Sequence, residues 1–424
     1  MQATMKFKGW FITLLTALVL VLHLTAPNRV WVMLLIGLGL IQVIAYFWAR
    51  SLRQNFSLTR ERRYTWAQVG DRIEERFTIN NRGYFPALWV EVIDSSTMPG
   101  YSASRVTGIG ISTSHRWRTD GICTQRGVFQ LGPTQANLGD PFGLFTVEQI
   151  YPTVVDFTIA PPVVDLPDIQ IATRGHLGEE VPRPFSLAPT QPTATVRLYN
   201  SNDSLNRIHW PTTARRDDLY VRGMEELTAG DWWIVLDLDE RIHQGDGLDS
   251  TLEKSILIAA SMTERGLHDS HAVGLLAHGQ DSIWMLPKST NLQRWQIFRV
   301  LAQIKAGKLS LQDVLARSGQ LIKRDASVIV ITTAANPNWL DSLLLLGRQG
   351  VVPTVVCLFD EQTRGAAQGL LQTLAMQNIR GHLIDHTTMK IPTPEELAGR
   401  WEWRILGMGR VVAVSRPEGS WERM

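Results

Sequence analysis

Two long apolar runs near the N-terminus constrain the fold of this chain more than any other feature. WFITLLTALVLVLHLTA covers residues 10–26, and VWVMLLIGLGLIQVIAYFWA covers residues 30–49. Each run is close to the roughly 20 residues that a bilayer-spanning helix needs. Aromatic side chains stand near the ends of the runs, where amphipathic rings favour the membrane interface: Trp10, Trp31, Tyr46 and Trp48. The sequence therefore predicts two transmembrane helices.

Basic residues flank these runs on one side of the membrane. Lys6 and Lys8 precede the first run, and the link between the runs carries only Arg29. A group of arginines follows the second run: Arg50, Arg53, Arg60, Arg62 and Arg63. The positive-inside rule therefore places residues 1–9 and the bulk of the chain in the cytoplasm, as a multi-pass protein of the cell membrane. A cleavable signal peptide is the alternative for the first run, but Leu24 is too large for the outer position of a cleavage site.

The charge balance and the cysteines argue against some functional classes. The 42 basic residues are matched by 40 acidic ones, and a net charge of +2 argues against a dedicated nucleic-acid binder. Cys123 and Cys357 are the only two cysteines and lie far apart in the sequence. They provide neither a disulfide framework nor a CxxC metal or redox site.

Short alternating runs predict a β domain over residues 50–160. In RIEERFTI, Ile73, Phe77 and Ile79 alternate with charged residues, which is the pattern of a half-buried strand. Further strands are predicted at ALWVEVID, 113–118, 128–131 and 153–160. We expect an antiparallel β-sandwich here. Residues 161–202 are rich in proline and predict an irregular connector.

From residue 232 onward, strand and helix patterns alternate. The predicted strands are WWIVLDL, AVGLLA, SIWML, SVIVITT, VVPTVVCLF and residues 380–384. The predicted helices are TLEKSILIAASMTERG, LQRWQIFRVLAQIK, NWLDSLLLLG, closed by Gly347, and residues 363–376. Such alternation is typical of a mostly parallel sheet covered by helices on both faces.

Two segments resemble the domain-of-unknown-function 58 family. QRGVFQLGPTQANLGDPFGLF, residues 125–145, is similar to that family's "RG…lGP…DPFGLF" segment, and residues 202–222 are similar to its "I-h/d-W…s/t-AR…L.V." block. The family's usual order is two membrane helices, a β domain, this block and a von Willebrand A-like domain. The resemblance therefore covers nearly the whole chain and implies a three-layer, Rossmann-like α/β domain within residues 203–424. Asn202 replaces a family glycine and a family glutamate is missing before it, which weakens any inherited role for that turn.

The resemblance also implies a function. Members are typically bacterial or archaeal membrane proteins, often encoded beside MoxR-type AAA+ ATPases, and have no established enzymatic activity. A non-enzymatic, membrane-anchored scaffold that works with a MoxR-type ATPase in the assembly or maturation of envelope components is therefore expected, with no cofactor.

A second hypothesis is a divalent-metal-dependent adhesion-type module. A von Willebrand A domain can bind a metal through Asp-x-Ser-x-Ser after its first strand. Asp237 stands at the motif's Asp position, but Asp239 and Arg241 replace the two serines, and Thr332 and Thr333 follow a later strand where an Asp is expected. These residues predict a degenerate remnant that holds no metal. In that case Asp237 and Asp239 simply end a buried strand and cap nearby backbone.

Other signals of chemistry are weak. His268, His271 and His278 have some of the spacing of a zinc site, but a strand about 20 Å long separates His278 from the others at 3.3 Å per residue. Ordinary loop histidines are expected instead. The sequence has no GxSxG elbow and no GxxxxGK[ST] loop, and Cys357 is predicted to be a core residue.

The densest polar stretch is NRIHWPTTARRDDLYVR, residues 206–222. Asp203 can cap a short helix before it, PTTARR predicts a second helical turn, and LYVR predicts a strand entering the α/β sheet. Ile208 and Trp210 are predicted to anchor in the core. Three arginines are expected to pair with acidic neighbours Asp203, Asp217 or Glu225 and clasp the connector to the sheet: Arg207, Arg215 and Arg216.

Two alternatives remain for this stretch. In the first alternative, its arginines and His209 form a surface that binds acidic groups of a partner. In the second, the protein is a hydrolase that uses His209 with Asp203. Because the sequence offers no accompanying nucleophile or oxyanion site, we assign no catalytic residue.

Overall fold

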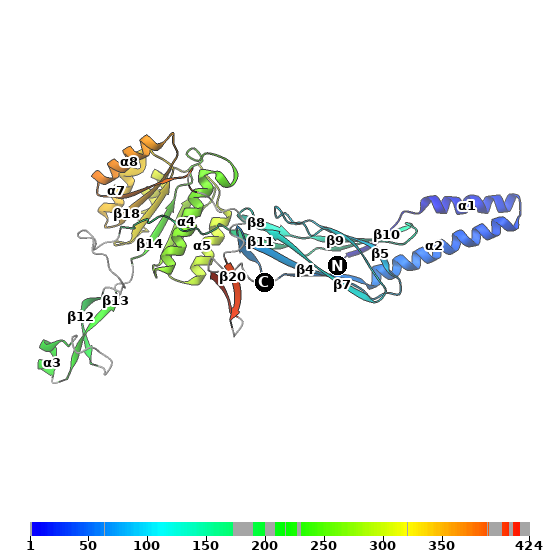
Figure 1. Ribbon diagram of the computed structural model, residues 1–424, viewed down its shortest axis with the longest axis horizontal. Helices are drawn as coiled ribbons and strands as arrows, with labels where there is room; N and C mark the ends of the chain where they lie inside the picture. The colour runs from blue at the N-terminus through cyan, green and yellow to red at the C-terminus, as the bar shows by residue number, and fades with distance from the viewer. Residues whose placement is uncertain are drawn as a thin grey trace, which may run out of the picture. The chain divides into compact units, whose positions relative to one another are not determined.

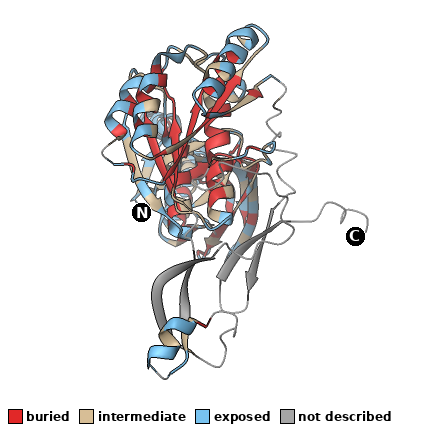
Figure 2. Ribbon diagram, turned by 90° about the vertical axis from the view of Figure 1, so that its left-hand side faces the viewer, coloured by how far each residue is buried: buried red, intermediate tan, exposed pale blue. Residues whose placement is uncertain are grey.

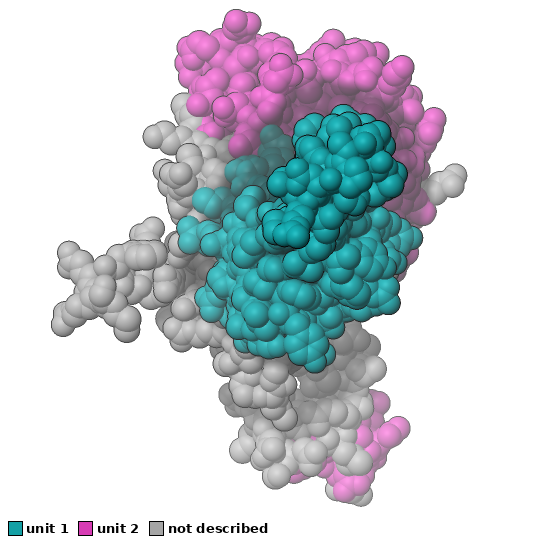
Figure 3. Space-filling view, turned by 90° about the vertical axis from the view of Figure 1, so that its right-hand side faces the viewer, with its two compact units in different colours: residues 1–162, 392–424 teal, residues 163–391 magenta. Residues whose placement is uncertain are grey.

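The computed structural model describes residues 2–62, 64–172, 190–199, 208–216, 218–226, 230–319, 321–387, 389, 401–406 and 410–415. The chain divides into two compact units, one of residues 1–162 with 392–424 and one of residues 163–391 (Figure 3). Residues 163–172, part of the predicted connector, thus belong to the second unit, and the C-terminal residues group with the first.

The two apolar runs form an antiparallel pair of helices, α1 (Trp10–Thr25) and α2 (Arg29–Asn55) (Figure 1). Asn28 caps α2 by accepting a hydrogen bond from the Val30 backbone N–H, and the Gln42 side-chain amide donates to Thr16 Oγ1 at 2.8 Å between the helices. Of the two, α2 is long and apolar enough to cross a membrane. It continues beyond the predicted end because its last turns pack on the β strands, where Ala49 and Leu52 are fully buried.

The described residues up to Ala160 form three sheets of the β unit. The five-stranded sheet has the order β1 (Gln2–Phe7), β10 (Phe145–Tyr151), β9 (Thr134–Gly139), β5 (Ala87–Asp94) and β6 (Arg105–Ile109). The second sheet has the order β2 (Phe56–Arg62), β4 (Arg72–Asn81) and β7 (Thr113–Ile122). The third has β3 (Trp66–Gln68), β11 (Val155–Ala160) and β8 (Gly127–Leu131). All pairs are antiparallel except β3 with β11, so the predicted antiparallel architecture is confirmed with one local exception.

The inner faces of these sheets share one apolar core. Phe77 stacks on Trp117 with ring centroids 5.4 Å apart, and both side chains are buried with Leu138 and Phe157. Residues 2–7, which were assigned to a cytoplasmic N-terminus separate from the β domain, form β1 and pair with β10 from Phe7↔Phe145 to Gln2↔Ile150. Because β1 and β2 both lie in this unit, α1 leaves it and α2 returns to it as a hairpin.

The second unit is built on a six-stranded sheet. Its order is β16 (Ser282–Lys288), β15 (Val273–His278), β14 (Trp232–Leu236), β17 (Ser327–Thr332), β18 (Val352–Phe359) and β19 (Arg380–Asp385). Only the edge strand β16 is antiparallel to its neighbour. In chain order this is 3-2-1-4-5-6, the Rossmann order, and it is consistent with a von Willebrand A-type domain. Every strand predicted in this unit's sheet is confirmed.

Helices cover this sheet, and Figure 2 shows buried strands beside helices with exposed outer faces. They are α4 (Thr251–His268), α5 (Asn291–Gln303), α6 (Leu311–Ser318), α7 (Leu340–Arg348) and α8 (Arg364–Met376). The short helix α6 was not predicted. Gly347 does not close α7, because the helix runs through it and the left-handed turn comes at Gly350, with φ of 95°.

The connector is more regular than predicted. Its first residues lie along the α/β unit: the Val164 backbone N–H donates to Ser261 Oγ, and the Ala172 N–H donates to Thr354 Oγ1, both at 3.0 Å. Further on, β12 (Thr190–Leu198) pairs with β13 (Tyr220–Glu226), and a bulge after Pro192 accommodates the missing N–H of proline. The prediction of an irregular connector is therefore wrong for residues 190–198, whereas residues 161–172 contain no helix or strand, as predicted. The strand predicted from LYVR exists as β13, but it pairs with β12 and does not enter the α/β sheet.

The short helix α3 (Trp210–Arg216) precedes β13, as the PTTARR pattern predicted. Near the C-terminus β20 (Trp401–Leu406) and β21 (Arg410–Ser415) form an antiparallel hairpin.

Candidate functional site

The strongest candidate site in the α/β unit lies at the carboxyl ends of β14 and β17. These neighbouring strands are the first and fourth of the sheet, so the strand order reverses between them. Open α/β sheets bind ligands outside the carboxyl ends of the strands at such a switch point. Asp237 and Asp239 follow β14, and Thr332 ends β17. The fold therefore brings together the residues that the sequence marked as a metal-site remnant.

Asp237 is held inside the protein by both of its carboxylate oxygens. Oδ2 accepts a hydrogen bond from Thr332 Oγ1 at 2.6 Å, and Oδ1 accepts one from the Asp239 backbone N–H at 3.3 Å. Burial raises the pKa of Asp237 to about 6, even though these hydrogen bonds act in the opposite direction. The carboxyl therefore changes charge near neutral pH.

Asp239 forms an ion pair with Arg241. Arg241 Nε lies 2.8 Å from Oδ1 and Nη2 lies 2.5 Å from Oδ2, which is the two-point geometry that guanidinium and carboxylate groups favour. The hydrogen bond from Arg241 keeps the pKa of Asp239 below its usual value. The Arg241 side chain is 67% exposed, so this positive charge faces solvent.

His243 completes the site, and the sequence did not single it out. Its Nε2 lies 3.1 Å from the carbonyl oxygen of Asp237, and its Nδ1 lies 3.3 Å from Thr251 Oγ1. Burial lowers the pKa of His243, so the ring is neutral and donates from Nε2 to the carbonyl. Its place in the segment that joins β14 to α4 was the signal that could have revealed it.

This donor set does not fit a divalent cation. Both oxygens of Asp237 are engaged inside the protein, and both oxygens of Asp239 are paired with Arg241. A hard cation needs several open oxygen ligands and is repelled by a guanidinium group at the same position. Within the described ranges, no group of three or more His, Cys, Asp or Glu side chains has metal-site geometry.

Two of the three histidines in the predicted cluster have local partners, and both cysteines are buried. His271 stacks on Trp232, with ring centroids 4.4 Å apart, and His278 contacts Ser282 Oγ at 2.6 Å. Cys357 is buried in β18 as predicted, and burial raises the pKa of the thiols of Cys123 and Cys357 to about 12. Thiols with such pKa values are poor nucleophiles at neutral pH.

The motif of residues 206–222 is only partly a core element. Ile208 is buried as predicted, but Trp210 is 65% exposed, so its predicted role as a core anchor is wrong. The reason is that α3 is a short helix in which no residue is buried. Arg216 lies over the Tyr220 ring at 5.6 Å, and Arg215 and Arg216 are both exposed. Asp203, Arg207, Asp217 and the side chain of Glu225 lie outside the described residues, so the predicted pairing of the arginines stays a prediction.

His209 has no catalytic geometry in the described part of the motif. Its Nδ1 lies 2.7 Å from Thr212 Oγ1, within the first turn of α3, and its backbone N–H donates to the Tyr220 carbonyl. These contacts hold the start of α3 against the start of β13.

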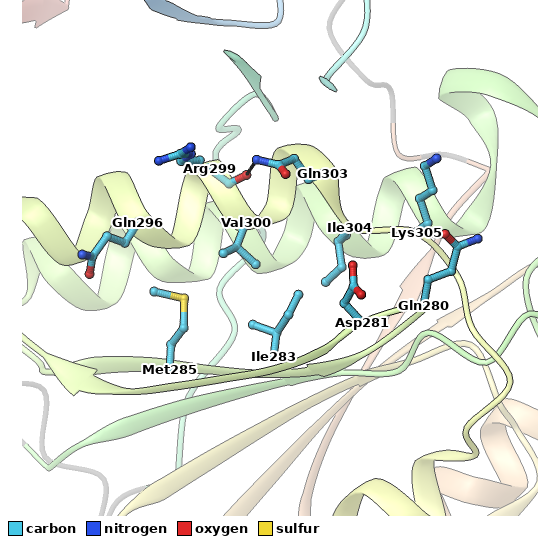
Figure 4. Close-up of a pocket in the computed structure, with 10 residues that line it drawn as sticks. All are labelled: Gln280, Asp281, Ile283, Met285, Gln296, Arg299, Val300, Gln303, Ile304 and Lys305. Atoms are coloured by element: carbon cyan, nitrogen blue, oxygen red, sulfur yellow. Dashed lines mark hydrogen bonds between the residues drawn. The ribbon is translucent and has the colours of Figure 1, made fainter. Parts of the chain in front are cut away.

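A groove of about 670 Å³ lies between α5 and β16 (Figure 4). Ile283 and Met285 rise from β16 toward Val300 and Ile304, and polar side chains line the rest: Gln280, Asp281, Gln296, Arg299, Gln303 and Lys305. One end of the groove is close to the switch-point site, because Gly307 bonds to the backbone of Leu238 and Glu240.

With this geometry established, the chain can be compared with known proteins. Residues 195–365 match the family described as "Protein of unknown function DUF58". The DUF58 match contains the α3 motif, the switch-point site and the groove. No curated protein matches the chain.

Several solved structures are similar to parts of the chain. An aerotolerance-related membrane protein from Bacteroides fragilis, carrying multiple mutations to serine, is 16% identical over 37% of this chain and 92% of its own, with a TM-score of 0.26. The CARDB domain of the PF1109 protein from Pyrococcus furiosus, solved with di-metal ions, is 12% identical over 25% of this chain and 94% of its own, with a TM-score of 0.18. A beta-glucosidase from Listeria innocua is 9% identical, and the match spans only 16% of that enzyme, with a TM-score of 0.18. At these scores none of the three bears on function.

Proposed function

We propose that this protein is a non-enzymatic, membrane-anchored interaction protein. The hairpin of α1 and α2 would hold it in the cell membrane, with both units in the cytoplasm, and the α3 motif would bind a protein partner. The resemblance to the DUF58 family suggests that this partner is a MoxR-type AAA+ ATPase that acts in the assembly or maturation of envelope proteins.

The exposed side chain of Trp210 carries the partner-binding part of the proposal. A large aromatic side chain that is 65% exposed contributes little to the packing of its own chain. Tryptophan and arginine are the residue types that most often dominate binding energy in protein interfaces. Arg215 and Arg216 stand on the same short helix, and all three lie within the DUF58 match. The surface suits a partner segment with acidic groups beside an apolar pocket.

The helical hairpin supports the anchoring part of the proposal. α2 has the length and composition of a membrane span, and α1 lies antiparallel to it. Because β1 and β2 lie in the same unit, both ends of the hairpin must be on one side of the bilayer. Lys8, Arg50 and Arg53 are exposed at those ends, as the positive-inside rule requires of a cytoplasmic side. Cleavage after the first run would also remove β1 from its pairing with β10.

Co-purification from native membranes tests the α3 surface and the partner assignment. The full chain should recover an AAA+ ATPase, and Trp210→Ala should lose it. Leu292→Ala is the matched control, because Leu292 is 63% exposed on a different element, and this variant should keep the partner. Recovery that survives Trp210→Ala would contradict the α3 surface, and repeated recovery of the wild type without any AAA+ ATPase would contradict the partner assignment.

A further inference from the structure

Three turns of the β unit lie at the end from which the helical hairpin leaves. They are residues 82–86, 110–112 and 140–144, which we call the turn collar. The strand register fixes their position, because Asn81 pairs with both Phe56, the residue after α2, and Thr113. On the other sheet, Phe7, two residues before the N-cap of α1, pairs with Phe145. The Asn81 side-chain amide donates to the carbonyls of Phe85 and Gly110 and ties the first two turns together.

The turn collar is bonded directly to the two helices. The backbone N–H groups of Lys8 and Gly9 donate to the Leu144 carbonyl at 2.7 and 3.1 Å, immediately before α1 begins. Trp48 on α2 donates from Nε1 to the Pro86 carbonyl at 2.9 Å and stacks on Phe85, with ring centroids 4.7 Å apart. The collar and the base of the hairpin therefore form one rigid junction.

Each turn presents a large apolar side chain to solvent. Tyr84 is 87% exposed, Ile111 is 52% exposed and Phe142 is 44% exposed. Turns in soluble proteins normally carry small polar residues at such tips. Apolar side chains are also exposed where α1 begins, next to the Gly9 contact with Leu144: Trp10 is 68% exposed and Phe11 is 62% exposed.

Helix length shows how deep the collar must lie. α1 has 16 residues, so it is about 24 Å long at 1.5 Å per residue, against about 30 Å for the hydrocarbon core of a bilayer. α1 begins right after Gly9, which contacts the collar, so no further helical residues are available at this end to reach across the bilayer. The hairpin can therefore reach deeper into the bilayer only if the β unit moves toward the membrane with it. A short span is accommodated by local thinning of the bilayer or by sinking of the residues that flank it.

We infer that the turn collar is a membrane-docking surface that enters the headgroup region of the bilayer beside the hairpin. Tyr84, Ile111 and Phe142 would lie at the depth where aromatic and apolar anchors are stable, and exposed cations around the junction would face anionic headgroups: Lys8, Arg50, Arg53 and Arg82. This inference rests on the proposed anchoring by α1 and α2. It fixes the β unit on the membrane surface.

Depth-dependent fluorescence quenching tests the inference on the full chain. Single cysteines are introduced by Tyr84→Cys, Ile111→Cys or Phe142→Cys and labelled with a small fluorophore; the native thiols are buried and stay unlabelled. Labelled protein is reconstituted in phosphatidylcholine–phosphatidylglycerol vesicles that carry a lipid-bound nitroxide near the headgroup. Val154→Cys is the matched control, because Val154 is 41% exposed and lies beyond the opposite end of β10. Met33→Cys, at a position 72% exposed on α2, reports insertion of the hairpin.

The expected result is a loss of fluorescence of about twofold at the three collar positions, as for residues in the interfacial belt, with no loss at Val154→Cys. Quenching at Met33→Cys together with collar signals equal to that of Val154→Cys would overturn the docking surface and leave the anchor intact. An unquenched label at Met33→Cys would instead overturn the anchoring by the hairpin, and the docking inference would fall with it.

Discussion

The two units of this protein place the same ion pair, arginine with carboxylate, in opposite settings. In the β unit, Arg60 lies between Glu75 and Asp94, with side-chain exposures of 8%, 1% and 0%, so the network is sealed between strands. In the α/β unit, the side chain of Asp239 is 8% exposed, but its partner Arg241 is 67% exposed. The first network can only support structure, whereas the second presents its charge to anything that approaches the switch point.

The pKa values follow from these settings. Burial alone lowers the pKa of Arg60, but the hydrogen bond and charge of Glu75, with Asp94, raise it overall. Arg62 lies beside the same Glu75, yet burial and the charge of Arg60 lower its pKa. Glu75 and Asp94 are thus each paired with a buried arginine, and Tyr101 donates a further hydrogen bond to Glu75.

Removing a carboxylate from the sealed network should have the largest effect. Glu75→Ala leaves Arg60 and Arg62 buried beside the space that it occupied, and loss of one partner of a buried pair costs about 3–5 kcal/mol of unfolding free energy. Chemical unfolding of the detergent-solubilised protein measures it. The matched control is Asp120→Ala on the same sheet, where Arg72 and Asp120 are 3.7 Å apart and 65% and 60% exposed. Its cost should stay below about 1 kcal/mol, and equal costs for the two variants would refute the distinction.

The buried carboxyl of the α/β unit should make stability depend on pH. The folded-state pKa of Asp237 is about 6, above the ordinary value of 3.8, so the unfolded state ionises first as pH rises. Below about pH 4 the group is neutral in both states and costs nothing; between about pH 4 and 6 stability falls, by about 3 kcal/mol in total at 1.36 kcal/mol per pKa unit.

The neutral variant Asp237→Asn isolates this contribution. The difference between wild type and variant in unfolding free energy should change over that pH window and be constant above it. A difference that does not vary with pH would show that Asp237 ionises normally in the folded protein.

The α/β sheet could be predicted from the sequence, and the reason is physical. Parallel strands covered on both faces are continuous apolar runs, and every residue of WWIVL in β14 is indeed buried. The alternation of these runs with helical periodicity marks each element locally. The helix α6 was missed because a short amphipathic stretch carries too little periodic signal.

The β unit was predicted less completely, because its elements depend on distant partners. β1 pairs with β10, far along the chain, and nothing in QATMKF marks it as a strand. Arg60 and Arg62 were interpreted as part of the basic flank of the membrane helix. In the structure they point inward from β2 to Glu75, so their charges are paired within the β unit.

The candidate sites divide in the same way. Asp237 and Asp239 could be placed at the end of β14 from sequence, because the strand pattern located the turn. The exposure of Trp210 could not be predicted, since an aromatic residue within a helical pattern is usually a core residue and only tertiary packing decides.

Substitution of Trp210 should show whether this residue belongs to an interface or to the core. An interface residue should have only a small effect on unfolding free energy. Trp210→Ala is expected to change unfolding free energy by less than about 0.5 kcal/mol, as surface substitutions do. Trp233, only 2% exposed on β14, provides the buried comparison, and Trp233→Ala should cost about 3–5 kcal/mol. Thermal and chemical unfolding of both variants measure the contrast. A large loss of unfolding free energy for Trp210→Ala would instead favour the structural role, between connector and sheet, that the sequence predicted.

The smallest expected effect concerns Arg241, the exposed arginine beside Asp239. Calorimetry with Mg²⁺ or Mn²⁺ measures whether this side chain prevents metal binding. The wild type should give no binding heat, because Arg241 already neutralises Asp239. Arg241→Ser removes the guanidinium and frees both oxygens of Asp239 for a cation, so weak binding is expected, with a dissociation constant on the order of 10⁻³ M, as for oxygen-ligand sites with few charges. Adding Asp237→Asn to this variant should abolish the heat. Binding by the wild type that Asp237→Asn removes would instead favour the metal-dependent adhesion-type module, and would show that Arg241 moves aside for the ion.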